Sequence, residues 1–151
     1  DDIMAVIHTH TPANLAVSAH KRGLLPITQQ AMRFYNRIAY HENAANDATR
    51  EGSMDIANAL GDKWNMLLEN HGAVVCGTTL AEAYIYHHFM ELACRAQANA
   101  IGAGDDLIIP PDAVCEQRAQ AAGKRGVYAS DSRDWQASIL FAEHHFPDYK
   151  L

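Results

Sequence analysis

The fold is decided by residues 3–23, which read IMAVIHTHTPANLAVSAHKRG. The run Ile3–Ile7 is apolar at every position, as expected of a central strand that is covered on both faces. Thr11 followed by Pro12 is typical of an N-cap with proline at the first helical position, and Gly23 would end the helix that follows. The segment therefore predicts a strand, a polar turn and a helix.

The rest of the chain continues this mixture of strands and helices. Apolar runs at Met66–Glu69 and Ala73–Gly77 predict two strands joined by an Asn-His-Gly turn. Leu24–Ile27 and Arg37–Tyr40 are candidate short strands, although their length leaves helix and strand open. Asn43–Gly52 is polar and is expected to be a surface loop. Helices are predicted at Ser53–Leu60, Thr79–Ile101, from Pro110-Pro111 past Gln120, and at Arg133–His145. This pattern predicts a layered sheet with helices on both faces.

Size and charge limit the classes of function. The 151 residues, 48% of them hydrophobic, predict one compact domain over residues 1–151. The formal net charge is -6 and the sequence contains no run of Lys and Arg. This argues against partners such as nucleic acid or an acidic membrane surface, whose phosphates need a basic patch.

The same sequence predicts a cytoplasmic location. No apolar stretch approaches the roughly 20 residues that cross a bilayer, and Asp1 and Asp2 are unlike the basic start of a signal peptide. Cys76, Cys94 and Cys115 are odd in number and far apart, which is unsuited to a disulfide framework. We expect buried thiols in a reducing compartment.

Two histidines in the opening segment carry the most specific chemistry. If the strand continues through His8 and His10, its period of two places both imidazoles on one face. A catalytic metal needs about three protein ligands and an open position, and His71, in the Asn-His-Gly turn, is the best third candidate. Asn70 is a candidate to orient one of these ligands. Spacing alone also fits a surface or core pair of histidines.

Three blocks of the sequence resemble the class II aldolase/adducin family, in matching order and spacing. They are AVIHTHTPANLAVSA, LLPITQQAMRF and LLENHGAVVCGTTLAEAY, and the similarity continues through PPDAVCE to the closing FPDYK. The resemblance implies an α/β fold, a three-layer α/β/α sandwich with a mixed, largely antiparallel central sheet. It also implies that His8, His10 and His71 bind one divalent metal ion, zinc first, with manganese, cobalt, nickel or iron as alternatives.

The implied activity is that of a metal-dependent lyase. Family enzymes cleave a carbon-carbon bond in a small hydroxy-ketone or sugar phosphate through a metal-stabilised enediolate. The alternatives that share the site are an epimerase, a dehydratase, a decarboxylase and an iron oxygenase. A different class of alternative is a non-catalytic, adducin-like oligomerisation domain, although adducin-type members lack the full set of three histidines.

The resemblance also leaves roles for residues outside the histidine group. It implies a homotetramer with active sites at subunit interfaces, and Tyr149 is the candidate proton donor from a neighbouring subunit. Family aldolases carry a catalytic glutamate before the His-x-His strand, whereas only seven residues precede His8. The acid/base residue is therefore unknown and expected upstream, in a part of the family domain that this chain lacks. Glu42 and Glu69 are not assigned to that role.

The predicted long helix carries two more histidines. His87 and His88 are adjacent, so their side chains point about 100° apart and cannot both face one metal. We expect them to be packing or interface residues.

Overall fold

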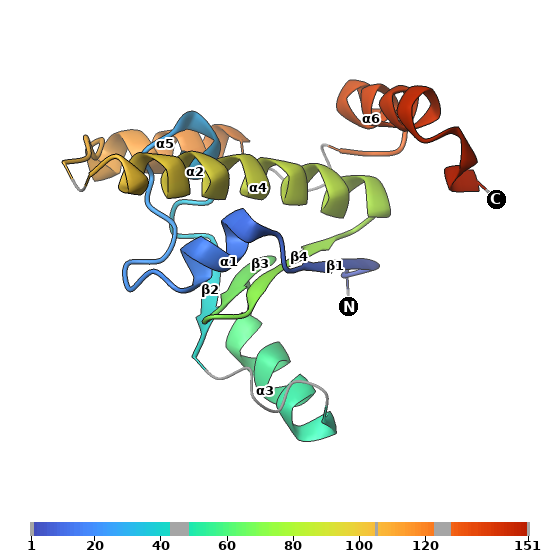
Figure 1. The fold of residues 1–151 in the computed structure, drawn as a ribbon. Helices are drawn as coiled ribbons and strands as arrows, with labels where there is room; N and C mark the ends of the chain where they lie inside the picture. Colours follow the sequence, from blue (N-terminus) through green and yellow to red (C-terminus); the bar gives the residue numbers. More distant parts are fainter. Residues whose placement is uncertain (1, 43–48, 105, 123–127, 151) are drawn as a thin grey trace.

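The computed structural model describes residues 2–42, 49–104, 106–122 and 128–150. Within these ranges a four-stranded sheet lies between two layers of helices (Figure 1). Its elements are β1 (Ala5–Thr9), α1 (Pro12–Ser18), α2 (Gln29–Met32), β2 (Ile38–His41), α3 (Arg50–Leu60), β3 (Asn65–Leu68), β4 (Gly72–Gly77), α4 (Leu80–Gly102), α5 (Asp112–Ala122), α6 (Arg133–His145) and the 3-10 helix η1 (Pro147–Lys150).

The sheet has the strand order β1-β4-β3-β2. Strand β4 pairs with β1 and with β3 in antiparallel fashion, whereas β2 and β3 are parallel, so the predicted mixed, largely antiparallel sheet is confirmed. Thr9 is opposite Ala73, and Leu68 is opposite Gly72. The last residues of β1 therefore lie beside the turn that joins β3 to β4.

The two helical layers cover opposite faces of this sheet (Figure 1). On one face α1 and α4 pack over β3 and β4, where Val17 and Met90 join Leu67 in the larger core cluster. On the other face Leu60 of α3 packs against Met66, the neighbour of Leu67 in β3. Successive residues of a strand point to opposite faces, so a single strand contributes to both cores. The three-layer prediction is confirmed.

The opening strand differs from its prediction in place and in extent. Strand β1 is an edge strand of the described sheet rather than a central one, and it runs through His8 to Thr9. Among the described residues only β4 pairs with it, and Val6 in the strand and Met4 just before it are 59% and 78% exposed. The run Ile3–Ile7 is apolar at every position, yet the described residues do not cover both faces of the strand that it forms.

The candidate strand at Leu24–Ile27, for which the sequence also leaves helix open, is neither, because a helix side chain takes the place of a strand partner. The N–H of Leu25 donates to Oε1 of Gln97 at 2.6 Å, and Nε2 of Gln97 donates to the carbonyl of Gly23 at 2.8 Å. Gln97 is fully buried in α4. The other short candidate is confirmed as β2, which lies one residue later than predicted.

The predicted helices are confirmed, although α1 ends at Ser18 rather than at Gly23, and threonine side chains cap the starts of α3 and α4. The hydroxyl of Thr49 accepts from the N–H of Gly52 at 3.0 Å, so α3 begins earlier than expected and takes in the end of the predicted loop. Residues 43–48 of that loop lie outside the described residues. Thr79 caps α4 in the same way, through the N–H of Glu82.

Two further expectations concern the whole chain. Cys76, Cys94 and Cys115 are buried free thiols, as predicted. In the part of the chain that the structure describes, no helix combines the length and the apolar character that crossing a membrane requires.

Candidate metal centre

The histidines of the opening segment lie side by side at the end of β1. Because the strand continues through Thr9, His8 and His10 point to the same side, as the period of two predicts. The centroids of their rings are 4.6 Å apart. The continuation of β1 past its predicted end is therefore what brings these two imidazoles together.

His71 reaches the same place from the turn between β3 and β4. Asn70, before it, has a positive φ of 55°, which is the left-handed conformation that asparagine tolerates. The ring centroid of His71 lies 5.0 Å from that of His8 and 4.7 Å from that of His10. One nitrogen from each of the three rings lies within 4.8 Å of the others. The structure thus brings together the three residues proposed from sequence.

The hydrogen bond of His8 determines which of its nitrogens faces the group. Nδ1 of His8 lies 2.9 Å from the carbonyl oxygen of Ala73, which can only accept, so Nδ1 carries the hydrogen. Nε2 of His8 then presents a lone pair, and it lies 2.8 Å from Nε2 of His10. Two ring nitrogens placed in this way can share one proton or one metal ion. The arrangement fits metal binding, in which a carbonyl commonly fixes the tautomer of a ligand histidine.

The close approach of β1 and β4 depends on a glycine. Gly72 has a φ of +148°, and a Cβ added there would lie 2.3 Å from the carbonyl oxygen of Thr9 and 3.0 Å from Cδ2 of His10. Both distances are shorter than a normal contact, and one involves backbone that cannot move aside easily. Any side chain at Gly72 would therefore push the His10 segment away from His71.

The donor set and its exposure suit a catalytic ion. His8 and His10 are exposed and His71 is half-buried, so a bound ion would be accessible to a small molecule. Three imidazoles form the set that zinc uses in catalytic sites, where the remaining position holds water or substrate. Among the described residues, no Asp or Glu side chain belongs to this group. Glu42 and Glu69 line a separate hollow of about 220 Å³.

The structure gives the positions of Asn70 and Tyr149, but it does not test the roles predicted for them. The backbone N–H of Asn70 donates to the carbonyl of Ser18 at 3.3 Å, and its side chain is exposed. Tyr149 lies in η1 with 44% of its surface exposed. In Figure 1 η1 is well separated from the end of β1, so a single chain does not bring Tyr149 to the histidines.

Sequence reasoning missed the hydrogen bonds that join Thr9 and Thr11 to helix α4. Thr9, between the two ligands, has its Oγ1 2.7 Å from Nε2 of His87, and Thr11 donates to the carboxylate of Glu91. The available signal was positional: His87 and Glu91 are four residues apart, on one face of a predicted helix. His88 does not share this role, because its exposed ring lies against Phe89.

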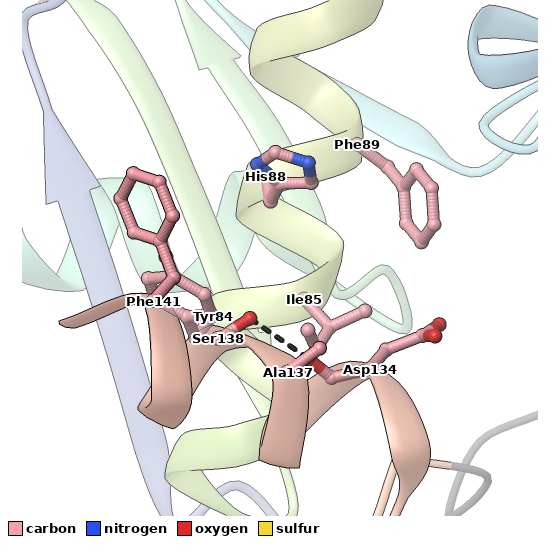
Figure 2. A pocket seen from close by; sticks show the side chains of 8 residues that line it. All are labelled: Tyr84, Ile85, His88, Phe89, Asp134, Ala137, Ser138 and Phe141. Atoms are coloured by element: carbon pink, nitrogen blue, oxygen red, sulfur yellow. Dashed lines mark hydrogen bonds between the residues drawn. The ribbon is translucent and has the colours of Figure 1, made fainter. Parts of the chain in front are cut away.

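A larger hollow of about 490 Å³ lies elsewhere, between α4 and α6, and none of the three histidines lines it (Figure 2). Its walls are mainly apolar and are lined by Tyr84, Ile85, His88, Phe89, Asp134, Ala137, Ser138 and Phe141. In Figure 2 the hydroxyl of Ser138 donates to the backbone carbonyl of Asp134, at 2.8 Å, so this polar group is satisfied within α6. A search for the active site by hollow volume alone would therefore have favoured this hollow over the candidate metal centre.

Comparison with curated proteins finds aldolase and adducin relatives. A protein of Caulobacter vibrioides named "Putative aldolase class 2 protein" is 31% identical over 150 residues, which are 99% of this chain and 58% of that protein. Gamma-adducin of Rattus norvegicus is 38% identical over 112 residues, 72% of this chain and 16% of the adducin. The chain thus spans less than two thirds of the length of the Caulobacter relative.

Solved structures agree with these relatives. An aldolase II superfamily protein from Pseudomonas syringae is 36% identical with a TM-score of 0.90, and the match covers 99% of this chain and 60% of that one. The L-fuculose 1-phosphate aldolase of Glaciozyma antarctica PI12 is 26% identical with a TM-score of 0.74, covering 95% of this chain and 53% of that one. The family described as "Class II Aldolase and Adducin N-terminal domain" matches residues 1–98. The chain therefore belongs to the class II aldolase and adducin family.

Proposed function

We propose that this chain carries the metal-binding half of a cytoplasmic class II aldolase-type lyase, which cleaves a carbon-carbon bond in a small hydroxy-ketone or sugar phosphate. The observation that carries the proposal is the group of His8, His10 and His71, with three ring nitrogens within 4.8 Å. The likeness to an L-fuculose 1-phosphate aldolase supports the substrate class. Zinc is the ion proposed first, because three imidazoles and an open position suit it.

Each element of the site contributes one property to this chemistry. A divalent ion, when bound, supplies positive charge where negative charge develops on the substrate oxygens. The carbonyl of Ala73 keeps the lone pair of His8 Nε2 directed toward the group, at the 2.8 Å separation from His10 Nε2. Because His8 and His10 are exposed, a small substrate could reach an ion bound there. The described residues therefore supply the ligands of the ion and the hydrogen bond that orients one of them.

Proton transfer is assigned to groups outside the described histidine group. The acid/base residue is proposed to lie upstream of His8 because the family resemblance implies a glutamate there, and among the described residues no carboxylate joins the histidines. Asn70 is proposed to orient a ligand from the turn, and Tyr149 to donate a proton to the site of a neighbouring subunit in a homotetramer. The separation of η1 from β1 in Figure 1 supports a role between subunits rather than within one.

The first experiment measures metal content. The purified full-length protein, without a tag, is analysed for metals by mass spectrometry before and after chelation. About one zinc, manganese, cobalt or nickel ion per subunit is expected, and its loss is expected in His8→Ala and His71→Ala, because an open site has no spare ligand. His144→Ala is the matched control, since His144 is an exposed histidine of α6 beside His145. Full metal content in His71→Ala would contradict the proposal.

The second experiment measures the reaction. Aldehyde release from phosphorylated hydroxy-ketones, L-fuculose 1-phosphate among them, is expected from the metal-loaded protein and not from His71→Ala. Release of water or carbon dioxide, or interconversion of epimers, would indicate a dehydratase, a decarboxylase or an epimerase. Iron as the resident metal, with oxygen consumption, would indicate an oxygenase.

A second candidate function is a non-catalytic, adducin-like domain that serves oligomerisation. The observation that favours it is the 38% identity with gamma-adducin over 72% of this chain. This function predicts an oligomer whose size and stability are the same with and without metal, and no metal after zinc, manganese, cobalt, nickel and iron are supplied. Metal bound in equal proportion to subunits would exclude it.

A further inference from the structure

Helix α4 lies on the opposite side of the His8–Thr11 segment from the candidate metal centre, as its bonds to Thr9 and Thr11 show. His8 and His10 point to one side of the chain, and the residues that alternate with them, Thr9 and Thr11, point to the other side, where α4 lies. Oγ1 of Thr9 is 2.7 Å from Nε2 of His87, and Oγ1 of Thr11 donates to Oε2 of Glu91. Each threonine is adjacent to His10, and Thr9 is also adjacent to His8.

The spacing of the two hydrogen bonds matches the geometry of the elements that make them. Residues two apart in an extended chain are separated by about 6.6 Å, and residues four apart in a helix rise by about 6 Å. A chain that is extended from Thr9 to Thr11, as it is in the structure, therefore lets both threonines bond to His87 and Glu91 at the same time. That is the conformation in which His8 and His10 share a face.

Both contacts are supported by further partners. Nδ2 of Asn14, which is fully buried, donates to Oγ1 of Thr9 at 2.8 Å, so the hydroxyl hydrogen of Thr9 remains for Nε2 of His87. Burial lowers the pKa of His87 below its ordinary value of 6.5, so the ring is neutral at pH 7 and one of its nitrogens can accept. Arg95, one turn further along α4, pairs with Glu91 at 3.6 Å. The network therefore joins three elements, β1, α1 and α4.

We propose that His87 and Glu91 are positioning residues, which hold Thr9 and Thr11 and thereby fix the separation of His8 and His10 for a metal ion. The inference rests on the proposed function, because it concerns the same site. It assigns to α4 a role in metal affinity although no α4 side chain belongs to the histidine group. Hydrogen bonds made directly to metal ligands typically change metal affinity by about 10–100-fold when they are removed, and these bonds act one residue away from the ligands, so the lower end of that range is expected.

The test compares metal affinity in variants of the full-length protein. The dissociation constant for zinc is measured by competition with a chromogenic chelator, and the visible absorption of the cobalt-loaded protein reports ligand geometry. His87→Ala and Thr9→Val are each expected to raise the dissociation constant by about 10-fold and to alter the cobalt spectrum. His87→Gln, whose amide can still bond to Thr9, is expected to restore affinity. His88→Ala is the matched control and is expected to leave both readouts unchanged.

A double variant separates positioning from a general loss of stability. If Thr9 and His87 act through their shared hydrogen bond, Thr9→Val combined with His87→Ala loses no more affinity than either change alone. Thr9→Val preserves side-chain volume, so it tests the proposal even if His87→Ala fails to fold. Melting temperatures of the metal-free variants check that a change in affinity does not follow a change in stability.

The possible failures are distinguishable. Wild-type zinc affinity in both Thr9→Val and His87→Ala, with loss of zinc in His8→Ala, would overturn the positioning role while the metal site stands. A wild-type protein that binds no metal would overturn the proposed function, and this inference with it. Additive losses in the double variant would also contradict the proposal, because they would show that the two side chains act separately.

Discussion

Helix α4 and helix α6 are both predicted from their helical spacing, but they have different surroundings. Nine residues of α4 are buried, whereas no residue of α6 is. We call residues 133–150, which contain α6 and η1, the C-terminal arm. The arm extends beyond one end of α4 (Figure 1), and its side chains Leu140 and Phe141 are 66% and 58% exposed. The comparison teaches that apolar spacing predicts a helix in both cases, but not whether the described chain covers its apolar face.

The largest effect of burial in α4 is expected on the reactivity of its cysteine, Cys94. Burial raises the pKa of Cys94 from 9.0 to about 12, so at pH 8 its thiolate fraction is about a thousandfold smaller than that of an ordinary thiol. Alkylation of Cys94 by iodoacetamide in the native protein should therefore be slower than in urea by at least this order. Mass spectrometry of timed samples measures it. Rapid native labelling at Cys94 would show that the α4 side of the core opens readily.

The comparison is sharpened by the same substitution in each region. Leu67 is 1% exposed in the core, so Leu67→Ala should lower the free energy of unfolding by about 2–5 kcal/mol, through lost burial and a residual cavity. Leu140→Ala in the arm should change it by about 0.5 kcal/mol or less. Urea denaturation of both variants gives the two values. Equal losses would mean that the arm is as well packed in solution as the sheet.

A smaller effect is expected at the start of α4. The carboxylate of Glu82, which is fully buried, accepts from the N–H of Thr78 at 2.7 Å and from its hydroxyl at 2.8 Å. Glu82→Ala leaves these donors without that acceptor and should lower the free energy of unfolding by about 1–3 kcal/mol. Thermal unfolding of Glu82→Ala beside Glu143→Ala, an exposed glutamate of the arm, measures the contrast. A larger loss of stability in Glu143→Ala than in Glu82→Ala would contradict the prediction.

The smallest effect concerns an ion pair that joins α5 to the turn before β2. The hydrogen bond from Arg37 holds the pKa of Glu116 below its ordinary value of 4.5. A lowered carboxyl pKa stabilises the fold above the unfolded pKa, and the contribution disappears as the pH falls through the folded pKa. Wild type should therefore lose slightly more stability than Glu116→Gln between pH 6 and pH 3. Melting temperatures across this range test it, and identical slopes would contradict it.

Residues close in the sequence predicted their local structure well. Thr11 and Pro12 marked the start of α1, and the alternation through His8 and His10 placed two imidazoles on one face. The third ligand, His71, followed from the family resemblance together with its position in a turn. These features depend on backbone preferences and on a strand period of two, which act over a few residues.

Features that depend on distant partners were missed or misplaced. Leu24–Ile27 has the composition of a strand, but its backbone bonds to Gln97, more than seventy residues away. The position of β1 at an edge is a property of the whole sheet, which the local run Ile3–Ile7 does not contain. The bonds of Thr9 and Thr11 to α4 are likewise invisible without the packing of that helix on β1.

The length of α4 has a consequence for how this protein can change. His87 and Gln97 are ten residues apart, so they lie about 15 Å from one another along the helix axis, and each bonds to a different segment of the chain. Inserting or deleting one residue between them would rotate Gln97 by about 100° relative to His87 and break one set of bonds. Substitutions on the outer surface of α4 avoid this penalty. Evolution of this helix is therefore expected to proceed by replacement of residues, with its length between these two positions unchanged.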